Sequence, residues 1–115
     1  MGTKKSTVKQ SGKELYKPKT RLVNVNMEPC EIFIGRPSKW GNPFREDVHG
    51  TKAECVEQYR IWLMKPEQKW ILDDILELDG KVLGCYCYPK KCHGNELINF
   101  IEAAKNKQKL NGFFD

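Results

Sequence analysis

Three cysteines and a histidine are concentrated within nine residues of this chain. They are Cys85, Cys87, Cys92 and His93, with the spacing C-x-C-x4-C-H. Cys85 and Cys87 are two positions apart in a predicted strand, so their side chains project from the same face. Three thiolates and an imidazole complete the tetrahedral coordination that zinc prefers, and these four residues are therefore candidate metal ligands. Zinc is the one cofactor that the sequence indicates.

The same segment also contains the parts of a catalytic centre. Cys92 and His93 precede a predicted helix, whose dipole and free backbone N–H groups stabilise a thiolate or a bound anion. Cys92 is therefore a candidate nucleophile, and His93 is a candidate general base or phosphate ligand. In a third interpretation, Cys85 and Cys87 are small apolar residues buried in a strand, which is a common position of free cysteine.

A second segment, residues 35–44, combines charged, aromatic and amide side chains with glycines and prolines. Its candidate ligand-binding residues are Arg36, Ser38, Lys39, Trp40 and Asn42. Arg36 and Lys39 can neutralise a phosphate, and Trp40 can offer a face on which a base stacks. Together these side chains are typical of a nucleotide pocket. In the alternative interpretation, Trp40 and Phe44 fill the core and the loop is only rigid.

Alternating and helical hydrophobic patterns predict the elements that carry these segments. In chain order they are strands at 21–26 and 30–35, a loop at 36–44, helices at 51–64 and 66–78, a strand at 81–87, a loop at 88–95 and a helix at 96–107. Thr51 and Glu54 have the spacing of a capping box at the start of the first helix. The apolar residues of this helix fall on one face, which is predicted to pack inward: Cys55, Val56, Tyr59, Trp62 and Leu63. The spacing predicts one helix up to Leu78, before a turn at Asp79-Gly80.

This order predicts a small α/β domain with about three strands, in a mixed or parallel sheet, and three helices. A helix between two strands requires a crossover, which favours parallel pairing. Both chemically dense loops follow a strand, and sites in open α/β sheets form at the carboxyl ends of strands. We therefore expect the loops 36–44 and 88–95 to meet at one edge of the sheet.

The positive charge of the chain is concentrated at its N-terminus. Residues 1–21 contain seven of the 20 basic side chains and one of the 15 acidic ones, whereas the other 94 residues hold 13 basic and 14 acidic side chains. We expect a flexible basic arm at 1–20, one α/β domain at 21–108 and a C-terminal tail at 109–115. Such an arm either only solubilises the chain or holds nucleic acid through phosphate contacts. In the second interpretation a nucleotide or nucleic acid is the expected partner.

The sequence has no long apolar run, and its lysine-rich N-terminus is followed by no apolar segment of a secretory signal. We therefore expect a cytoplasmic protein without a membrane partner, located in the host cytoplasm if a phage encodes it.

Several motifs together resemble a small family of unknown function that occurs in phages, bacteria and archaea. They are Phe33-Ile34-Gly35-Arg36, Ser38-Lys39-Trp40-Gly41-Asn42-Pro43-Phe44, Leu83-Gly84-Cys85-Tyr86-Cys87 and Cys92-His93-Gly94. The resemblance runs from about Arg21 to Ala104 and implies a compact α/β domain with two signature loops. Pro37 replaces a glycine of the family pattern. Asn95 replaces an aspartate, and we expect it to cap the last helix.

Two functional hypotheses follow. The first is an enzyme that processes a nucleotide or nucleic acid, with a site built from residues 36–44 and 85–95. The second is a zinc-stabilised module without catalysis, which binds nucleic acid or a protein partner as a phage-type accessory protein.

Overall fold

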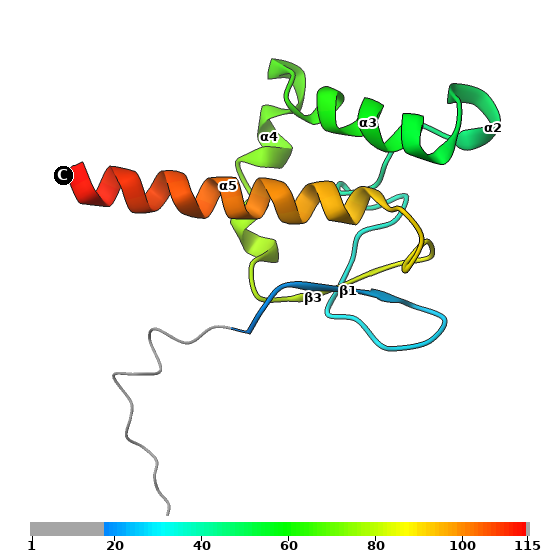
Figure 1. Cartoon of the computed structure of the whole chain (residues 1–115), viewed down its shortest axis with the longest axis horizontal. Helices are drawn as coiled ribbons and strands as arrows, with labels where there is room; N and C mark the ends of the chain where they lie inside the picture. The colour runs from blue at the N-terminus through cyan, green and yellow to red at the C-terminus, as the bar shows by residue number, and fades with distance from the viewer. Residues whose placement is uncertain (1–17, 115) are drawn as a thin grey trace, which may run out of the picture.

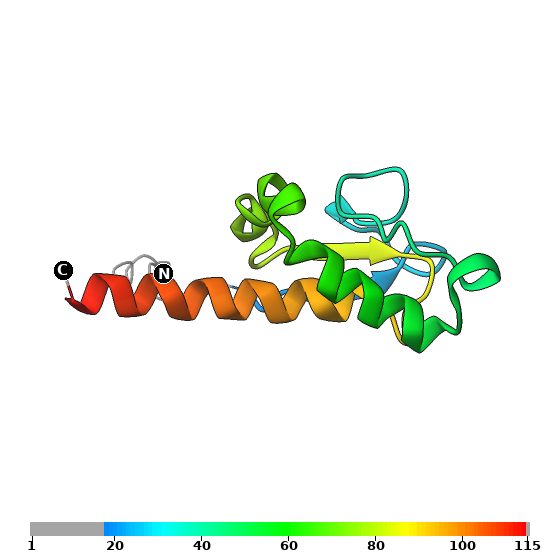
Figure 2. The same ribbon diagram turned by 90° about the horizontal axis from the view of Figure 1, so that it is seen from above.

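A computed structural model describes residues 18–114, so nearly all of the predicted basic arm at 1–20 lies outside the described residues. The elements are β1 (Arg21–Asn24), β2 (Ile32–Phe33), α2 (Glu46–His49), α3 (Lys52–Leu63), η1 (Pro66–Gln68), α4 (Lys69–Leu72), η2 (Ile75–Leu78), β3 (Val82–Cys85) and α5 (His93–Phe114). Figures 1 and 2 show that α3, α4 and α5 lie together on one side of the sheet, which gives a two-layer arrangement.

The sheet has three strands in the order β1-β3-β2, and both pairings are parallel. The last strand in the sequence is therefore the central one, with Leu83 opposite both Leu22 and Ile32. The predicted α/β class and the parallel sheet are confirmed. Because all three strands run in the same direction, the segments that follow β2 and β3 leave the sheet at the same end.

Gly84 allows the chain to pass close to the central strand. A Cβ atom at this position would lie 2.5 Å from Cys30 Sγ and 2.6 Å from Val25 Cγ1. Real side chains do not approach so closely, so only glycine fits here without movement of the neighbouring segment.

Helix α3 begins with the predicted capping box. Thr51 Oγ1 accepts a hydrogen bond from Glu54 N, and Glu54 Oε1 accepts one from Thr51 N. The buried face of the helix consists of Cys55, Val56, Tyr59 and Leu63. The predicted face also included Trp62, which is half-buried and packs against the core. Helix α3 contacts α5 and α4.

The single helix predicted for residues 66–78 is wrong. The segment contains the 3₁₀ turn η1, one turn of α-helix in α4 and the 3₁₀ turn η2. Ile71, Ile75 and Leu78 are still buried, so the apolar spacing is satisfied without a continuous helix. The interruption falls at Asp73-Asp74, and aspartate has a low preference for a helix interior because its side chain competes for backbone hydrogen bonds.

Helix α5 begins earlier and ends later than predicted. It starts at His93 instead of residue 96, and it continues to Phe114 through the segment expected as a tail. Leu97 and Ile101 are fully buried. The far end of α5 extends well beyond the other elements (Figure 1).

Candidate functional site

A cavity of about 410 Å³ lies where the segments after β2 and β3 meet. Its lining residues are Gly35, Arg36, Asn42, Phe44, Arg45, Glu46, Asp47, Lys52, Cys55, Val56, Cys85, Tyr86, Cys87, Lys91, Cys92 and His93. The predicted meeting of the two loops is therefore confirmed. The physical cause is the parallel sheet, which directs both loops to its carboxyl edge.

Two buried thiols line the cavity and contact each other. Cys85 ends β3, Cys92 directly precedes α5, and their Sγ atoms are 3.2 Å apart. Each of these residues is only 1% exposed. The backbone N–H of Gly94, in the first turn of α5, donates a hydrogen bond to Cys92 Sγ over 3.3 Å. Cys92 therefore occupies the capping position that was expected for Asn95.

His93 is held in a defined orientation beside this pair. Its Nε2 donates to the carbonyl oxygen of Ile34 over 2.8 Å, because that carbonyl can only accept. In the neutral ring Nδ1 is then an acceptor, and it lies 3.6 Å from Cys92 Sγ. The residue is 7% exposed, and burial lowers the pKa of His93. A neutral imidazole is consequently the favoured form at pH 7.

The electrostatics differ between the two thiols. The hydrogen bond from Cys92, further bonds from the backbone at Tyr88 and Cys87, and the charge of Lys52 lower the pKa of Cys85 to about 6. The interaction with Cys85 and burial raise the pKa of Cys92. These opposite directions favour ionisation of Cys85 over ionisation of Cys92, with the Cys92 thiol as hydrogen-bond donor to the Cys85 thiolate.

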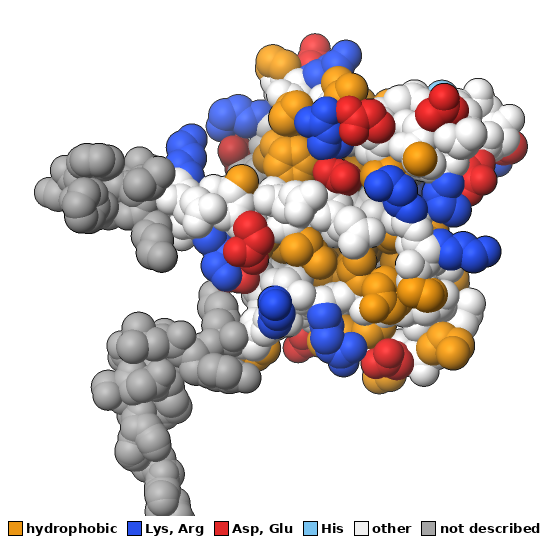
Figure 3. Space-filling view, in the orientation of Figure 1, with side chains coloured by type: hydrophobic (Ala, Val, Ile, Leu, Met, Phe, Trp, Pro, Cys, Tyr) orange, Lys and Arg blue, Asp and Glu red, His pale blue; other side chains and the backbone are white. Residues whose placement is uncertain are grey.

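Four basic side chains surround the thiols. Arg45 pairs with Asp47 over 3.0 Å, and Lys52 pairs with Glu46 over 2.8 Å. The bond to Glu46 raises the pKa of Lys52, which therefore stays charged. The other two, Arg36 and Lys91, form no ion pair within residues 18–114. Figure 3 shows basic side chains close to apolar ones where α2 and the start of α5 lie.

Two of the five predicted ligand-binding residues line the cavity. Arg36 Nη1 donates to the carbonyl oxygen of Asn42 over 2.7 Å, which leaves its other donors available. The side chain of Asn42 is used within the fold, because it donates to the carbonyl oxygen of Cys55 and accepts from Phe44 N. Asn42 therefore shapes the wall of the cavity.

The other three, Ser38, Lys39 and Trp40, do not line the cavity. Trp40 is 5% exposed and belongs to the core, and its carbonyl oxygen accepts a hydrogen bond from Tyr59 over 2.6 Å. Its ring therefore offers no open face for a base, in agreement with the alternative interpretation of this loop. Lys39 pairs with Asp74 at 2.5 Å. Ser38 Oγ accepts from Trp40 N at 3.3 Å.

The predicted zinc ligands are only partly gathered. Cys85, Cys92 and His93 are neighbours, whereas Cys87 is half-buried, with its Sγ 3.9 Å from Lys52 Nζ. Across residues 18–114, no three His, Cys, Asp or Glu side chains are arranged as a metal-binding group. Zinc binding stays a prediction.

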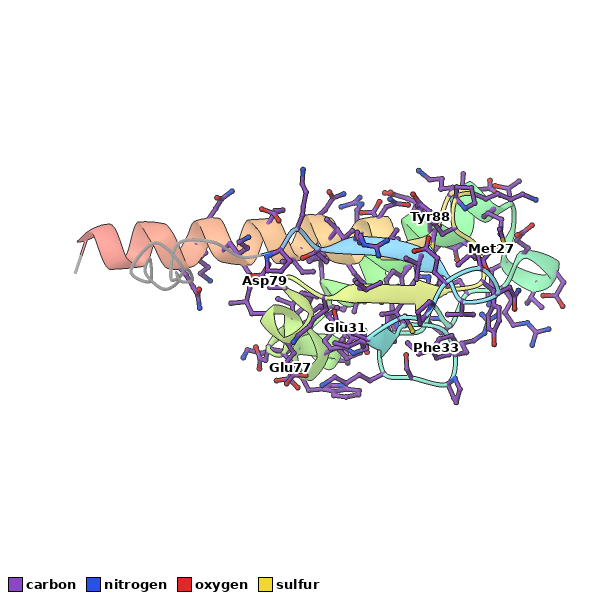
Figure 4. The ribbon with its side chains drawn as sticks, turned by 90° about the horizontal axis from the view of Figure 1, so that it is seen from below. Met27, Glu31, Phe33, Glu77, Asp79 and Tyr88 are labelled. Carbon is purple, nitrogen blue, oxygen red and sulfur yellow. The ribbon has the colours of Figure 1, made fainter. Side chains whose placement is uncertain are left out.

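Sequence analysis missed several residues of the cavity, above all Lys52, Lys91 and Tyr86. Lys91 was detectable as the immediate neighbour of Cys92, and Lys52 as the first residue after a helix cap that follows the site loop. Tyr86 is 63% exposed, and its ring meets Phe33 edge-on with centroids 5.7 Å apart. Tyr88 is also exposed, and Figure 4 shows it near the arrowheads of the strands, with Asp79 at the opposite end.

Fold and cavity define a small α/β domain with a ligand-sized hollow at the carboxyl edge of a parallel sheet. The chain belongs to the family described as domain of unknown function DUF4326, whose model matches residues 18–103. This range includes every residue that lines the cavity.

A curated relative is an uncharacterized 12.4 kDa protein in the nrdA-td intergenic region of Enterobacteria phage T4. The two are 30% identical over 83 residues, which cover 70% of this chain and 76% of the phage protein. The expected family of unknown function, with a phage member, is thereby confirmed. No solved structure matches the chain. In the part of the chain that the structure describes, no helix is long and apolar enough to cross a membrane.

Proposed function

We propose that the chain is an enzyme that binds a nucleotide, free or within a nucleic acid, in this cavity and acts on it through the Cys85–Cys92 thiols. The observation that carries the proposal is the convergence of basic side chains, an exposed aromatic ring and a thiol pair in one hollow. Its volume of about 410 Å³ lies within the range of small-molecule sites.

The basic side chains suit the phosphate. Neither Arg36 nor Lys91 forms an ion pair among the described residues, and the charge of Lys91 acts on Glu57 only from a greater distance, so an incoming anion has no salt bridge to break. A guanidinium binds phosphate through two parallel hydrogen bonds, and an ammonium binds it as a point charge. Lys52 adds a third positive charge close to the thiols.

An aromatic side chain suits the base. The role that the sequence suggested for Trp40 passes to Tyr86, which lines the cavity and also a second depression beside it. The exposed ring of Tyr88 borders the same depression. Bases stack on exposed aromatic faces with about 1–3 kcal/mol per base, so this surface can hold the base while the cavity holds the phosphate.

The thiol pair suits covalent catalysis. Cys85 Sγ, as thiolate, forms a bond to an electrophilic carbon of the nucleotide, and the bond from that carbon to its leaving group breaks. The Cys92 thiol supplies the proton to the leaving group. The Gly94 N–H and the start of α5 then stabilise the new Cys92 thiolate. Water next attacks the same carbon, the bond from Cys85 Sγ to that carbon breaks with Cys85 leaving as thiolate, and the proton of the water returns to Cys92. His93 Nδ1 is the base next to Cys92. The predicted catalytic residues Cys92 and His93 are thus retained, and Cys85 joins them as nucleophile.

Binding is tested by calorimetry with the ribo- and deoxyribonucleoside monophosphates, with inorganic phosphate as reference. Lys91→Ala should weaken nucleotide binding about tenfold or more, because a hydrogen bond to a charged group contributes about 1.5–3 kcal/mol. Lys81→Ala is the matched control, since Lys81 is exposed and lines neither the cavity nor the depression beside it. If no nucleotide binds, or both variants bind equally well, the proposal is wrong.

Catalysis is tested by incubating the protein with a mixture of nucleotides and a short oligonucleotide, followed by liquid chromatography and mass spectrometry. Turnover should disappear in Cys85→Ser and persist in Cys87→Ser, because Cys87 lines the cavity without belonging to the thiol pair. Turnover that survives in Cys85→Ser would remove the covalent step from the proposal.

The zinc-stabilised binding module is the second candidate. It is supported by the short distance between Cys85 and Cys92 and by the acceptor atom Nδ1 of His93 next to them. It predicts about one zinc per chain and a loss of folded structure on chelation. Elemental analysis of the purified full chain, with a melting curve in the presence of a chelator, tests both points. A metal-free, folded protein excludes this candidate.

A further inference from the structure

We propose that Cys85 and Cys92 are a redox modification site, in which a small hydroperoxide converts the two thiols into a reversible intramolecular disulfide. This inference is independent of the proposed nucleotide function, because it requires only the thiol pair and access for the oxidant. The proposal adds a covalent bond between two side chains that the structure shows only in hydrogen-bonding contact.

The distance between the sulfur atoms favours the bond. Cys85 Sγ and Cys92 Sγ are 3.2 Å apart, so they must approach by about 1 Å to reach disulfide length. All five cysteines of the chain are free, and this is the one thiol–thiol contact within residues 18–114. The other thiols with described contacts have different partners, since Cys55 Sγ faces the carbonyl oxygen of Gly50 and Cys87 Sγ faces Lys52.

The elements on either side keep the two sulfurs together. Cys85 is the last residue of the central strand β3, and Cys92 directly precedes α5, so both positions are fixed by regular structure. The six residues between them, 86–91, form a loop that needs no large rearrangement for the bond. The Gly94 N–H bond to Cys92 Sγ also orients the second sulfur toward the first.

The environment selects a small oxidant. Both cysteines are 1% exposed, but both line the cavity of about 410 Å³, which connects them to solvent. Hydrogen peroxide can enter such a hollow, whereas the direct approach of another protein's disulfide is blocked by the surrounding loops. The oxidant therefore reaches the two sulfur atoms through the cavity.

The reaction is balanced in two steps. The Cys85 thiolate attacks one peroxide oxygen, the O–O bond breaks, and Cys85 sulfenic acid and hydroxide form. Cys92 then attacks the Cys85 sulfur, the S–O bond breaks, and the disulfide forms while water leaves with the Cys92 proton. The hydroxide takes up the proton that Cys85 released on ionisation, so in total two thiols are oxidised and one peroxide is reduced to two waters. A thiol reductant reverses the change by exchange with the disulfide.

The test uses the full chain, treated with hydrogen peroxide and digested with trypsin without reduction. We expect the intact mass to fall by about 2 Da, as two hydrogens are lost. Cleavage at the lysines should yield peptide 82–90, which contains Cys85 and Cys87, linked to peptide 92–105, which contains Cys92. Dithiothreitol should restore the original mass and separate the peptides.

Variants identify the sulfur that takes part. In Cys87→Ser the link between the two peptides should persist, and this half-buried position allows the variant to fold. In Cys92→Ser the link should disappear, and Cys85 should instead gain about 16 Da as a sulfenic acid that dimedone traps. The wild-type peptide map and the Cys87→Ser variant answer the question even if Cys92→Ser does not fold.

Three results would overturn the inference. One is loss of the link in Cys87→Ser, which would assign the bond to Cys87. Another is a wild-type protein that keeps all five thiols reduced under peroxide, including a protein whose thiols are protected by bound zinc. The last is irreversible oxidation of Cys85 while Cys92 stays reduced. Because none of these measurements uses a nucleotide, their outcome is separate from the outcome of the binding experiment.

Discussion

Alkylation of Cys85 should follow the ionisation of a thiol whose pKa lies at about 6 rather than at the ordinary value of 9.0. The lowered pKa means that the reactive thiolate is present above about pH 6 and is lost as the pH falls below it. At pH 7 about nine-tenths of Cys85 is then thiolate, against about one-hundredth for an unperturbed cysteine. The structure therefore predicts a difference of roughly 90-fold in the amount of reactive form.

The largest cause of this shift is the hydrogen bond from the Cys92 thiol. Replacing Cys92 by alanine removes that donor, whereas the backbone bonds and the charge of Lys52 are still present. We expect the midpoint of the alkylation profile to move to higher pH in Cys92→Ala. The rate at pH 7 should fall by about tenfold or more, because each unit of pKa above the ambient pH reduces the thiolate about tenfold.

The assay measures iodoacetamide incorporation between pH 5 and pH 9 by mass spectrometry of peptide 82–90. Both proteins also carry Cys87→Ser, so that Cys85 is the single thiol in this peptide. Circular dichroism at each pH shows whether the fold is intact. A midpoint above pH 8 in the protein with Cys92, or equal midpoints with and without Cys92, would refute the assignment of the charge to Cys85.

Further predictions concern stability. Gly84→Ala should lower the free energy of unfolding in urea by about 1–3 kcal/mol, because its Cβ would overlap Cys30 and Val25; unchanged stability would contradict the packing described for β3. Burial lowers the pKa of His93 in the folded protein. Its contribution to the free energy of unfolding is therefore present above the pKa of about 6.5 that histidine has in the unfolded chain, and is lost as the pH falls. Urea unfolding at pH 7 and pH 5 should therefore show a larger loss in the wild type than in His93→Gln, and equal losses would argue against this role. Thr51→Ala should cost about 1 kcal/mol through loss of the cap, while Thr51→Ser retains the stability.

Much of the fold could be predicted because the relevant signals are local. The Thr51–Glu54 capping box and the apolar face of α3 depend on spacing within one helix, and both were found. The meeting of the two loops was also predictable, since it depends only on parallel strands and on which segments follow them. The cavity could be located from two signals: the polar and thiol side chains of the two loops, and the parallel direction of the strands that precede them.

Other features depend on contacts between distant segments. Trp40 has the same local sequence whether it faces a ligand or the core. Its burial depends on core residues from distant segments, and its carbonyl oxygen accepts a hydrogen bond from Tyr59, 19 residues away in the chain. Lys39 likewise turns to Asp74, which lies 35 residues away. The early start of α5 was missed because His93, Gly94 and Asn95 are weak helix formers, and a cysteine supplies the cap. None of these interactions can be predicted from the spacing of residues along the chain.

The position of β3 between β1 and β2 has a consequence for biosynthesis. Neither earlier strand has a partner until residues 82–85 leave the ribosome, so the first two strands must wait for most of the domain to be made. Pairing of Leu22 with Leu83 closes a long stretch of chain, which is characteristic of a slow folding step. The strand that completes the sheet also ends at Cys85. During synthesis, the thiol pair of Cys85 and Cys92 therefore cannot form before the chain segments of all three strands have been made.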